Sequence, residues 1–290
     1  MPRKISNTGI AISWVISRTF IMACILVIAR SLGAGGMSGP AIMFWQNTFA
    51  FVIYVTYCLY KKDIPTTQKY KLHLLRCTLG LSSGMLLFYC LPMMSLNKAT
   101  AITFTGPMFS TIAAMILLRE KTTIHRTIGL LVGFVGVLII LRPGTDAFNP
   151  ISALLLIVPM IWGLTDVTIK KLITTESTNS LLFHMVVIMM VFSIPLGIFF
   201  WHTPTTEQWV LCAALALFHL GNFTTISKAF KRADISVLMP FEFFRLIFSS
   251  VFAYFIFSES LDMAIVAGSL VIVGSTLYVA RKESKYGSKN

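Results

Sequence analysis

Apolar residues are gathered into ten long runs, which short polar segments separate. The runs cover about residues 9–30, 40–60, 72–94, 99–118, 125–141, 150–169, 180–201, 207–228, 234–257 and 261–280. A helix needs about 20 mainly apolar residues to cross a hydrocarbon core of roughly 30 Å, and the runs are close to that length. Because backbone polar groups find no water in that core, runs of this kind form helices. The pattern predicts an all-α integral membrane protein with ten transmembrane helices.

The composition supports a lipid-facing surface. Of the 290 residues, 56% are hydrophobic and 12% are charged, and the mean hydropathy is +0.79. A soluble domain has about 25% charged residues, so this chain lacks the charge to cover a surface in water. The five cysteines lie in apolar runs without metal-type spacing, and we interpret them as small buried side chains. No cleavable signal peptide is expected, because a short basic start leads into a run of full spanning length.

The basic residues predict the orientation of the chain. The 24 Lys and Arg exceed the 11 Asp and Glu and give a net charge of +13. In a soluble protein this excess would suggest nucleic acid, but here it lies in short loops, where the positive-inside rule explains it. If the N-terminus is cytoplasmic, 18 basic residues fall on the inner side: Arg3, Lys4, Lys61, Lys62, Lys69, Lys71, Arg119, Lys121, Arg126, Lys170, Lys171, Lys228, Lys231, Arg232, Arg281, Lys282, Lys285 and Lys289.

Three basic residues, Arg30, Lys98 and Arg142, fall on the outer side, and Arg18, Arg76 and Arg245 lie within runs. This bias predicts both termini in the cytoplasm and an external loop at residues 142–149. The expected location is the cytoplasmic (inner) membrane, and no nucleic-acid partner is expected.

The two halves of the chain share a pattern. Trp14 precedes Arg18 by four residues, and Trp162 precedes Asp166 by four. Both halves also carry a proline, then a glutamate, then a glycine nine residues after it: Pro107, Glu120 and Gly129 in the first, and Pro240, Glu259 and Gly268 in the second. Five helices per half is an odd number, so the halves enter the membrane from opposite sides. The prediction is a 5+5 inverted repeat with domains at 1–144 and 145–290.

Four charged residues lie near the middle of predicted helices: Arg18, Asp166, Glu242 and Arg245. Charge in a bilayer core costs about 2.5–3.5 kcal/mol per residue on insertion scales, so each needs an explanation. Glu242 and Arg245 are three residues apart and would share a helix face, beside a proline that permits a kink. The set predicts either a polar cavity that binds a solute with both charges, or an internal salt-bridge network that holds helices in register. The residues leave both interpretations open.

Aromatic residues accompany these charges. Trp14 and Trp162 lie one helical turn before Arg18 and Asp166, Phe104 precedes a proline, and Phe241 precedes Glu242. They are candidates for stacking on a planar ring or for cation–π contacts, although core packing or lipid contact is the favoured interpretation of any single one. Three amides in apolar runs could bind solute or bridge helices: Gln46, Asn47 and Asn222.

Other polar and small residues receive structural interpretations. Close helix packing is predicted for Gly129, Gly133, Gly136, Gly268 and Gly274. Glu120 and Glu259 lie at helix ends, and we expect them to anchor loops. The five histidines are scattered, and no two form a ligand pair on one helix. We therefore expect no metal, no cofactor and no catalytic residue.

Three stretches resemble a known family. They are residues 97–144, which begin "NKATAITFTGP"; residues 148–172, "FNPISALLLIVPMIWGLTDVTIKKL"; and residues 228–259, which begin "KAFKRADISVLMPFEFFR". They are similar to the EamA-type branch of the drug/metabolite transporter superfamily, with ten helices as 5+5. This branch includes S-adenosylmethionine uptake carriers of intracellular bacteria, riboflavin importers and exporters of amino acids and other metabolites. The resemblance thus implies a carrier of a small organic metabolite, with S-adenosylmethionine uptake or exchange as the preferred substrate hypothesis.

Three kinds of function are compatible with a polytopic membrane protein. A secondary carrier working by alternating access fits the charges gathered at mid-depth and the predicted inverted repeat. A membrane-embedded enzyme would need clustered His/Asp or paired-Asp residues near one surface, and a channel would need polar residues recurring along a helix face; neither pattern is present. No phosphate-binding P-loop is present either. The sequence favours a carrier that is not an enzyme, and it sets no oligomeric state.

Overall fold

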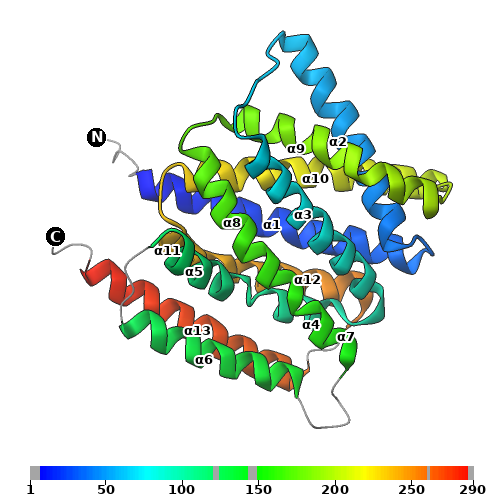
Figure 1. Ribbon diagram of the computed structural model, residues 1–290. Coiled ribbons are helices and arrows are strands. Elements are labelled where there is room, and N and C mark those ends of the chain that lie inside the picture. The colour runs from blue at the N-terminus through cyan, green and yellow to red at the C-terminus, as the bar shows by residue number, and fades with distance from the viewer. Residues whose placement is uncertain (1–6, 120–123, 143–148, 260–261, 287–290) are drawn as a thin grey trace, which may run out of the picture.

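The computed structural model describes residues 7–119, 124–142, 149–259 and 262–286, and every regular element in these ranges is a helix (Figure 1). The first half contains α1 (Asn7–Ala34), α2 (Gly39–Lys61), α3 (Tyr70–Cys90), η1 (Leu91–Met93), α4 (Leu96–Thr103), α5 (Gly106–Leu117) and α6 (Ile124–Leu141). The second half contains α7 (Pro150–Leu155), α8 (Ile157–Ile173), α9 (Thr178–Phe199), α10 (Thr206–Phe230), α11 (Ile235–Leu238), η2 (Met239–Phe243), α12 (Phe244–Phe257) and α13 (Met263–Tyr286). Glu120 and the loop at 143–148 lie outside the described residues.

Seven helical stretches in the described part are long and apolar enough to cross a membrane. They are Gly9–Ala34, Gly39–Lys61, Tyr70–Met93, Leu96–Leu117, Pro150–Ile173, Thr178–Phe199 and Thr206–Phe230. Three shorter apolar helices complete the set: Leu131–Ile140, Phe244–Phe257 and Met263–Ser275. The prediction of an all-helical, multi-pass membrane protein is confirmed, while the count of ten crossings stays a prediction.

Polar side chains mark where several helices begin. Ser38 caps α2 by accepting a hydrogen bond from the amide of Ala41, and Ser177 caps α9 in the same way. Thr205 and Gln208 form a reciprocal capping box at the start of α10. Such caps satisfy amides that have no partner within the helix, which fixes where each helix leaves its polar connection.

The fourth apolar run is two helices, α4 and α5, and not one. The break lies at residues 104–105, directly before Pro107. Proline has no N–H and its ring clashes with the carbonyl four residues earlier, so the helical hydrogen bond to Thr103 cannot form. The carbonyl oxygen of Thr103 instead accepts a hydrogen bond from Nη2 of Arg245, at 2.9 Å. The proline thus creates an acceptor in the protein interior, and a buried cation uses it.

The ninth run is broken in the same manner. It consists of the short helix α11, the 3₁₀ helix η2, which contains Pro240, and the longer helix α12. The sequence predicted that this proline permits a kink, and the backbone does change helix type there. Because η2 ends at Phe243, Glu242 and Arg245 lie in different elements, and the spacing of a continuous α-helix does not apply to them.

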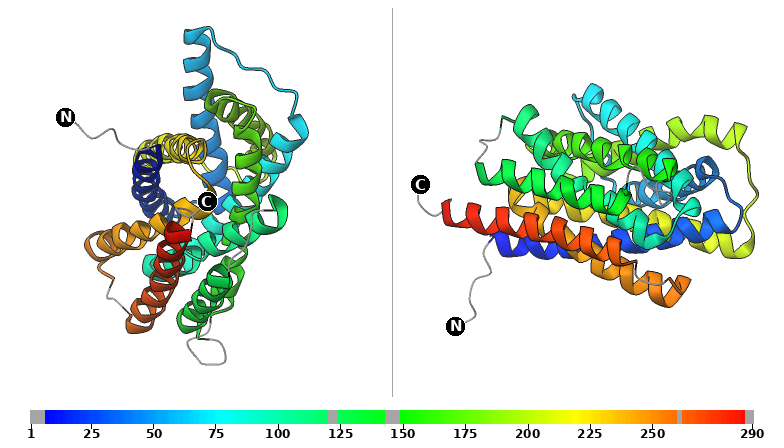
Figure 2. Two further views of the ribbon diagram at one scale, coloured as in Figure 1. Left: turned by 90° about the vertical axis from the view of Figure 1, so that its left-hand side faces the viewer. Right: turned by 90° about the horizontal axis from the view of Figure 1, so that it is seen from below.

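The helices of the two halves pack in matching pairs. α2 packs on α9, and α6 packs on α13, the green and red helices of Figure 1. α1 packs on α10 and α12, while its counterpart α8 packs on α3 and α5. Exchanging each helix for its counterpart in the other half leaves this set of pairs unchanged. α1 begins and α13 ends at the same end of the bundle (Figure 2).

Glycines allow α6 and α13 to approach closely, as the sequence predicted. A Cβ atom on Gly136 would lie 2.8 Å from the carbonyl oxygen of Gly268, and one on Gly268 would lie 2.6 Å from the carbonyl oxygen of Gly136. Gly274 does not share this role, because a Cβ atom there meets nothing within 4 Å. Gly133 also lies close to α13, since a Cβ atom there would be 3.2 Å from Oγ of Ser275.

Candidate functional site

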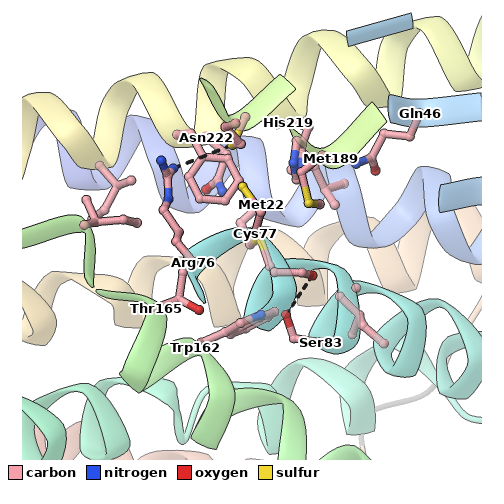
Figure 3. A pocket seen from close by; sticks show the side chains of 18 of the residues that line it. Met22, Gln46, Arg76, Cys77, Ser83, Trp162, Thr165, Met189, His219 and Asn222 are labelled. Atoms are coloured by element: carbon pink, nitrogen blue, oxygen red, sulfur yellow. Dashed lines mark hydrogen bonds between the residues drawn. The ribbon is translucent and has the colours of Figure 1, made fainter. Parts of the chain in front are cut away.

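A cavity lies in the middle of the bundle and is lined by residues from both halves (Figure 3). Its free volume is about 90 Å³, whereas one buried water needs roughly 10–15 Å³. The polar and aromatic lining residues include Arg18, Gln46, Arg76, Ser83, Trp162, Thr165, Asp166, His219, Asn222 and Phe223. Apolar walls with a few converging polar groups are typical of sites for small organic molecules.

Arg18 and Asp166 reach this cavity from opposite halves. Nη1 of Arg18 forms an ion pair with Glu242, and Nε donates to Oδ1 of Asn222 at 3.2 Å. Oδ2 of Asp166 accepts a hydrogen bond of 2.6 Å from Ser110. The pair of Arg18 and Glu242 carries no net charge, whereas the described contacts of Asp166 include no ion pair. Asp166 therefore supplies a negative group to the cavity wall.

Glu242 and Arg245 lie behind the central cavity, in a smaller pocket that Arg18, Trp162 and Asp166 also line. Both residues are 2% exposed. The sequence suggested that they act as a pair, but Glu242 binds Arg18, and Arg245 donates to the free carbonyl of Thr103. The guanidinium carbon of Arg245 also lies 5.8 Å from the ring centre of Phe104 and 5.7 Å from that of Trp162.

The predicted aromatic residues have different positions. Trp162 lines both the central cavity and the smaller pocket. Phe104 is fully buried beneath Arg245 and lines neither one. Trp14 lies under Lys228, whose Nζ is 4.5 Å from the ring centre, and Phe241 packs against an apolar cluster on the same side of the protein. The structure therefore brings Trp162, but not the other three, to the central cavity.

Three further residues line the cavity. The sequence indicates no role for Arg76 beyond a charge within an apolar run, and none for His219. It allows Gln46 either to bind solute or to bridge helices; Gln46 is fully buried, and neither its Nε2 nor its Oε1 has a hydrogen-bond partner. Nε2 of His219 also lacks a partner. The sequence signal that could have identified Arg76 and Gln46 as lining residues is a charged or amide side chain inside an apolar run.

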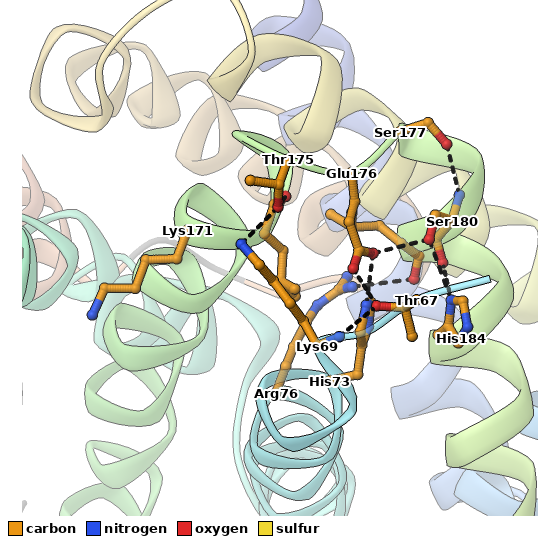
Figure 4. Close-up of polar contacts among 12 residues, drawn as sticks. Thr67, Lys69, His73, Arg76, Lys171, Thr175, Glu176, Ser177, Ser180 and His184 are labelled. Atoms are coloured by element: carbon orange, nitrogen blue, oxygen red, sulfur yellow. Dashed lines mark hydrogen bonds and ion pairs between the residues drawn. The ribbon is translucent and has the colours of Figure 1, made fainter. Parts of the chain in front are cut away.

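A polar cluster connects the halves near the turn between α8 and α9 (Figure 4). The carboxylate of Glu176 accepts hydrogen bonds from Thr67, from Nε2 of His73 at 2.8 Å and from Ser180 at 2.9 Å. The ring of His184 lies beside His73, with 4.8 Å between ring centres. Glu176, His73 and His184 offer potential ligand atoms within 4.8 Å of one another and could hold a metal ion. The sequence missed this group because its members come from different elements.

At the opposite end, Glu259 connects the halves in a second way. Its carboxylate pairs with Arg30 and accepts hydrogen bonds from the amides of Leu96, at 2.7 Å, and Asn97, at 3.1 Å. These amides belong to the first turn of α4, where a negative group stabilises the helix. The anchoring role predicted for Glu259 agrees with these contacts.

Neutralising Glu176 is expected to loosen the end of the bundle that it holds. Burial pushes the pKa of Glu176 upward, but the hydrogen bonds from Thr67, His73 and Ser180 outweigh it, and the pKa lies below its usual value. Because the pKa is lowered in the folded protein, the carboxylate stabilises this end at pH values above the unfolded-state pKa of about 4.3. The stabilisation is lost as the pH falls through the folded-state pKa. In the Glu176→Gln variant, we expect Cys77, which lines the cavity, to react with a thiol reagent about tenfold faster at pH 7.

The labelling is measured with the other four native cysteines replaced by alanine. Glu207→Gln is the control, because Glu207 is an exposed acid in the first turn of another helix, α10. Hydrogen exchange at residues 175–180 gives the pH test: wild type and variant should differ at pH 7 and converge as the pH falls through the lowered pKa of Glu176. An equal labelling rate in both proteins would show that this cluster does not hold the end closed.

The comparisons with known proteins agree with this geometry. The model of the EamA-like transporter family matches residues 9–142 and again residues 150–281. An S-adenosylmethionine uptake transporter of Rickettsia bellii is 29% identical, over 100% of this chain and 99% of that protein. A riboflavin transporter of Brucella anthropi is 27% identical, over 86% of this chain and 90% of that protein.

A solved crystal structure has the same fold, with a TM-score of 0.68 at 16% identity over 94% of this chain and 98% of that one. Since the family model matches nearly the whole chain in two successive segments, the protein belongs to the EamA-like transporter family.

Proposed function

We propose that the protein is a secondary carrier that moves an amphoteric metabolite of nucleoside size, S-adenosylmethionine or a close relative, across the cytoplasmic membrane. The observation that carries the proposal is the central cavity, which receives opposite charges from the two halves: Arg18 from α1 and Asp166 from α8. Trp162 adds an aromatic surface to the same wall. Buried charge is costly in a bilayer, and a solute with matching charges gives it a function.

The chemistry of S-adenosylmethionine fits this lining. Its sulfonium and ammonium groups would bind the carboxylate of Asp166, and its adenine ring would stack on Trp162. The relatives named as S-adenosylmethionine uptake transporters match 84–100% of the chain, which supports this solute. Riboflavin is the second candidate, because relatives with that name also match most of the chain. Riboflavin has a planar ring but no charge to pair with Asp166.

Alternating access between two inverted five-helix halves is the mechanism that we propose. The matching helix pairs support the division into two halves. We assign the gates to two sets of polar contacts, one at each end of the cavity. Glu176 connects the halves at one end, and Glu259 connects them at the other. A carrier must release one set while the other holds. The ten crossings and the division at residues 144–145 belong to this proposal.

Uptake by cells that produce the protein tests the proposal directly. Radiolabelled S-adenosylmethionine, riboflavin and a set of amino acids are supplied separately, and initial rates are compared with those of cells carrying an empty vector. We expect saturable uptake of S-adenosylmethionine that excess unlabelled solute abolishes. Transport of riboflavin alone would support the second candidate, and transport of none of the solutes would contradict both.

Cysteine labelling tests the orientation. In a variant without native cysteines, Glu207→Cys at the start of α10 is expected to react with an impermeant maleimide added to intact cells, because the basic residues gather in the loops of the other side and so leave this connection outside. Lys61→Cys at the end of α2 is expected to react after the cells are lysed and not before. Both positions are exposed, so burial does not explain a difference. The reverse pattern would place both termini outside.

A further inference from the structure

The guanidinium group of Arg76 lies in the wall of the central cavity with few partners of its own. Arg76 is 2% exposed and projects from α3. Its Nη1 donates to the carbonyl oxygen of Leu181 at 3.3 Å, its Nη2 contacts the sulfur of Met185 at 3.6 Å, and its Cζ lies 4.8 Å from the ring centre of Phe223. A guanidinium has five N–H donors, and these contacts engage two nitrogens weakly. No carboxylate in the described part of the chain forms an ion pair with it.

The other two arginines of the cavity region are compensated differently. Arg18 forms an ion pair with Glu242, and Arg245 donates to the carbonyl that a proline leaves free. Arg76 and Asp166 line one cavity with opposite charges, yet no ion pair joins them. Two opposite charges held apart in a low-dielectric cavity are stabilised when a bound molecule supplies a counter-charge to each.

We propose that Arg76 binds a carboxylate group of the transported solute, and that this contact selects amphoteric solutes over uncharged ones. The inference rests on the proposed carrier function and names the group that the cavity recognises. The planar fork of arginine matches a carboxylate with two parallel hydrogen bonds. Asp166 takes the positive group of the same solute, which neutralises both walls.

Gln46 extends the binding surface away from Arg76. The two side chains lie toward opposite ends of the cavity in Figure 3, with His219 between them. The amide of Gln46 offers a donor nitrogen and an acceptor oxygen, both buried and without partners. An amide of this kind forms two hydrogen bonds with a planar heterocycle that presents an acceptor beside an amino group, as adenine does. The solute is therefore long enough to place its carboxylate at one end and its ring at the other.

Binding to the purified wild-type protein in lipid nanodiscs tests the carboxylate contact. Competition against radiolabelled S-adenosylmethionine compares unlabelled S-adenosylmethionine with its decarboxylated analogue. Thermal stabilisation compares methionine with methioninamide. Stabilisation by riboflavin is measured separately, against the protein without ligand. We expect the molecule with the carboxylate to bind about 10- to 100-fold more tightly than its partner without it. Equal affinity of both members of each bound pair would overturn the proposal.

Variants then assign the contact to Arg76. Arg76→Gln is expected to lower affinity for the carboxylate-bearing molecule to that of its analogue while leaving the analogue's affinity unchanged, and Arg76→Lys should keep part of the preference. The matched control is Arg232→Gln, which removes an exposed arginine. If Arg76→Gln weakens both molecules equally, Arg76 is a structural link among α3, α9 and α10, and the proposal is wrong. If Arg76→Gln does not fold, the Arg76→Lys protein provides the same comparison, and an unchanged preference there would also count against it.

The two proposals fail separately. If another carboxylate-bearing solute stabilises the protein and S-adenosylmethionine does not, the assignment of the solute is wrong, and the role of Arg76 stands. If riboflavin binds and no carboxylate-bearing molecule does, the carrier function stands, and the role of Arg76 is refuted.

Discussion

Replacing Glu242 by glutamine is expected to destabilise the protein by about 3–5 kcal/mol, because the change leaves the Arg18 guanidinium buried without its ion-pair partner. The side chains of Arg18 and Glu242 are 12% and 3% exposed, so water compensates neither of them well. Uptake should fall at least tenfold as well, since the unpaired Arg18 would alter the charge of the cavity. Thermal unfolding in detergent and initial uptake rates measure the two effects.

The double variant Arg18→Leu with Glu242→Leu separates scaffold from binding site. Apolar residues of similar volume often replace a buried ion pair without loss of stability, so this protein should unfold close to the wild-type temperature. If the ion pair only joins α1 to η2, the double variant should regain both the stability and the uptake that Glu242→Gln loses. We expect stability to return and uptake to stay low, because Arg18 also lines the cavity. Arg142→Leu with Asp262→Leu is the control, since it removes an exposed ion pair whose members line neither the central cavity nor the smaller pocket.

Hydropathy alone predicted most of the helical plan. The first three apolar runs coincide with α1, α2 and α3, and the seventh and eighth with α9 and α10, because burying backbone polar groups in hydrocarbon leaves the helix as the available structure. The breaks before Pro107 and at Pro240 were less visible. A proline shows where a helical hydrogen bond is lost, but not whether the chain bends, changes to a 3₁₀ helix or starts a new helix.

Contacts between distant residues limited the prediction of the site. Arg18 and Glu242 are 224 positions apart, and no local pattern connects them. Spacing favoured Glu242 with Arg245, but the end of η2 between them removes the shared α-helical face. Arg76 carried the same signal as Arg18, a charge in an apolar run, and what distinguishes the two is the presence of a carboxylate partner in the folded protein. The sequence identifies costly groups, and tertiary structure decides how each is compensated.

Replacing Asp166 by asparagine is expected to reduce uptake of a cationic or amphoteric solute about 10- to 100-fold with little change in stability. The substitution keeps the size and an acceptor for the hydrogen bond from Ser110, so the contact between α5 and α8 persists. It removes the negative charge that Asp166 supplies to the cavity, and with it a charge-assisted contact worth about 1.5–3 kcal/mol. Initial uptake rates over a range of solute concentrations, together with thermal unfolding, measure the two quantities.

The pattern of loss across solutes makes this prediction specific to charge. Asp166→Asn should weaken binding of S-adenosylmethionine strongly and of an analogue without a positive group, such as S-adenosylhomocysteine with its amine acetylated, hardly at all. Asp166→Glu keeps the charge on a longer side chain and should retain more of the preference for the cation. Ser110→Ala is the control for the hydrogen bond: it removes the donor, leaves the carboxylate charged, and should affect both solutes alike. A parallel loss for S-adenosylmethionine and for the analogue without a positive group in Asp166→Asn would mean that Asp166 holds α8 against α5 and does not contact the solute.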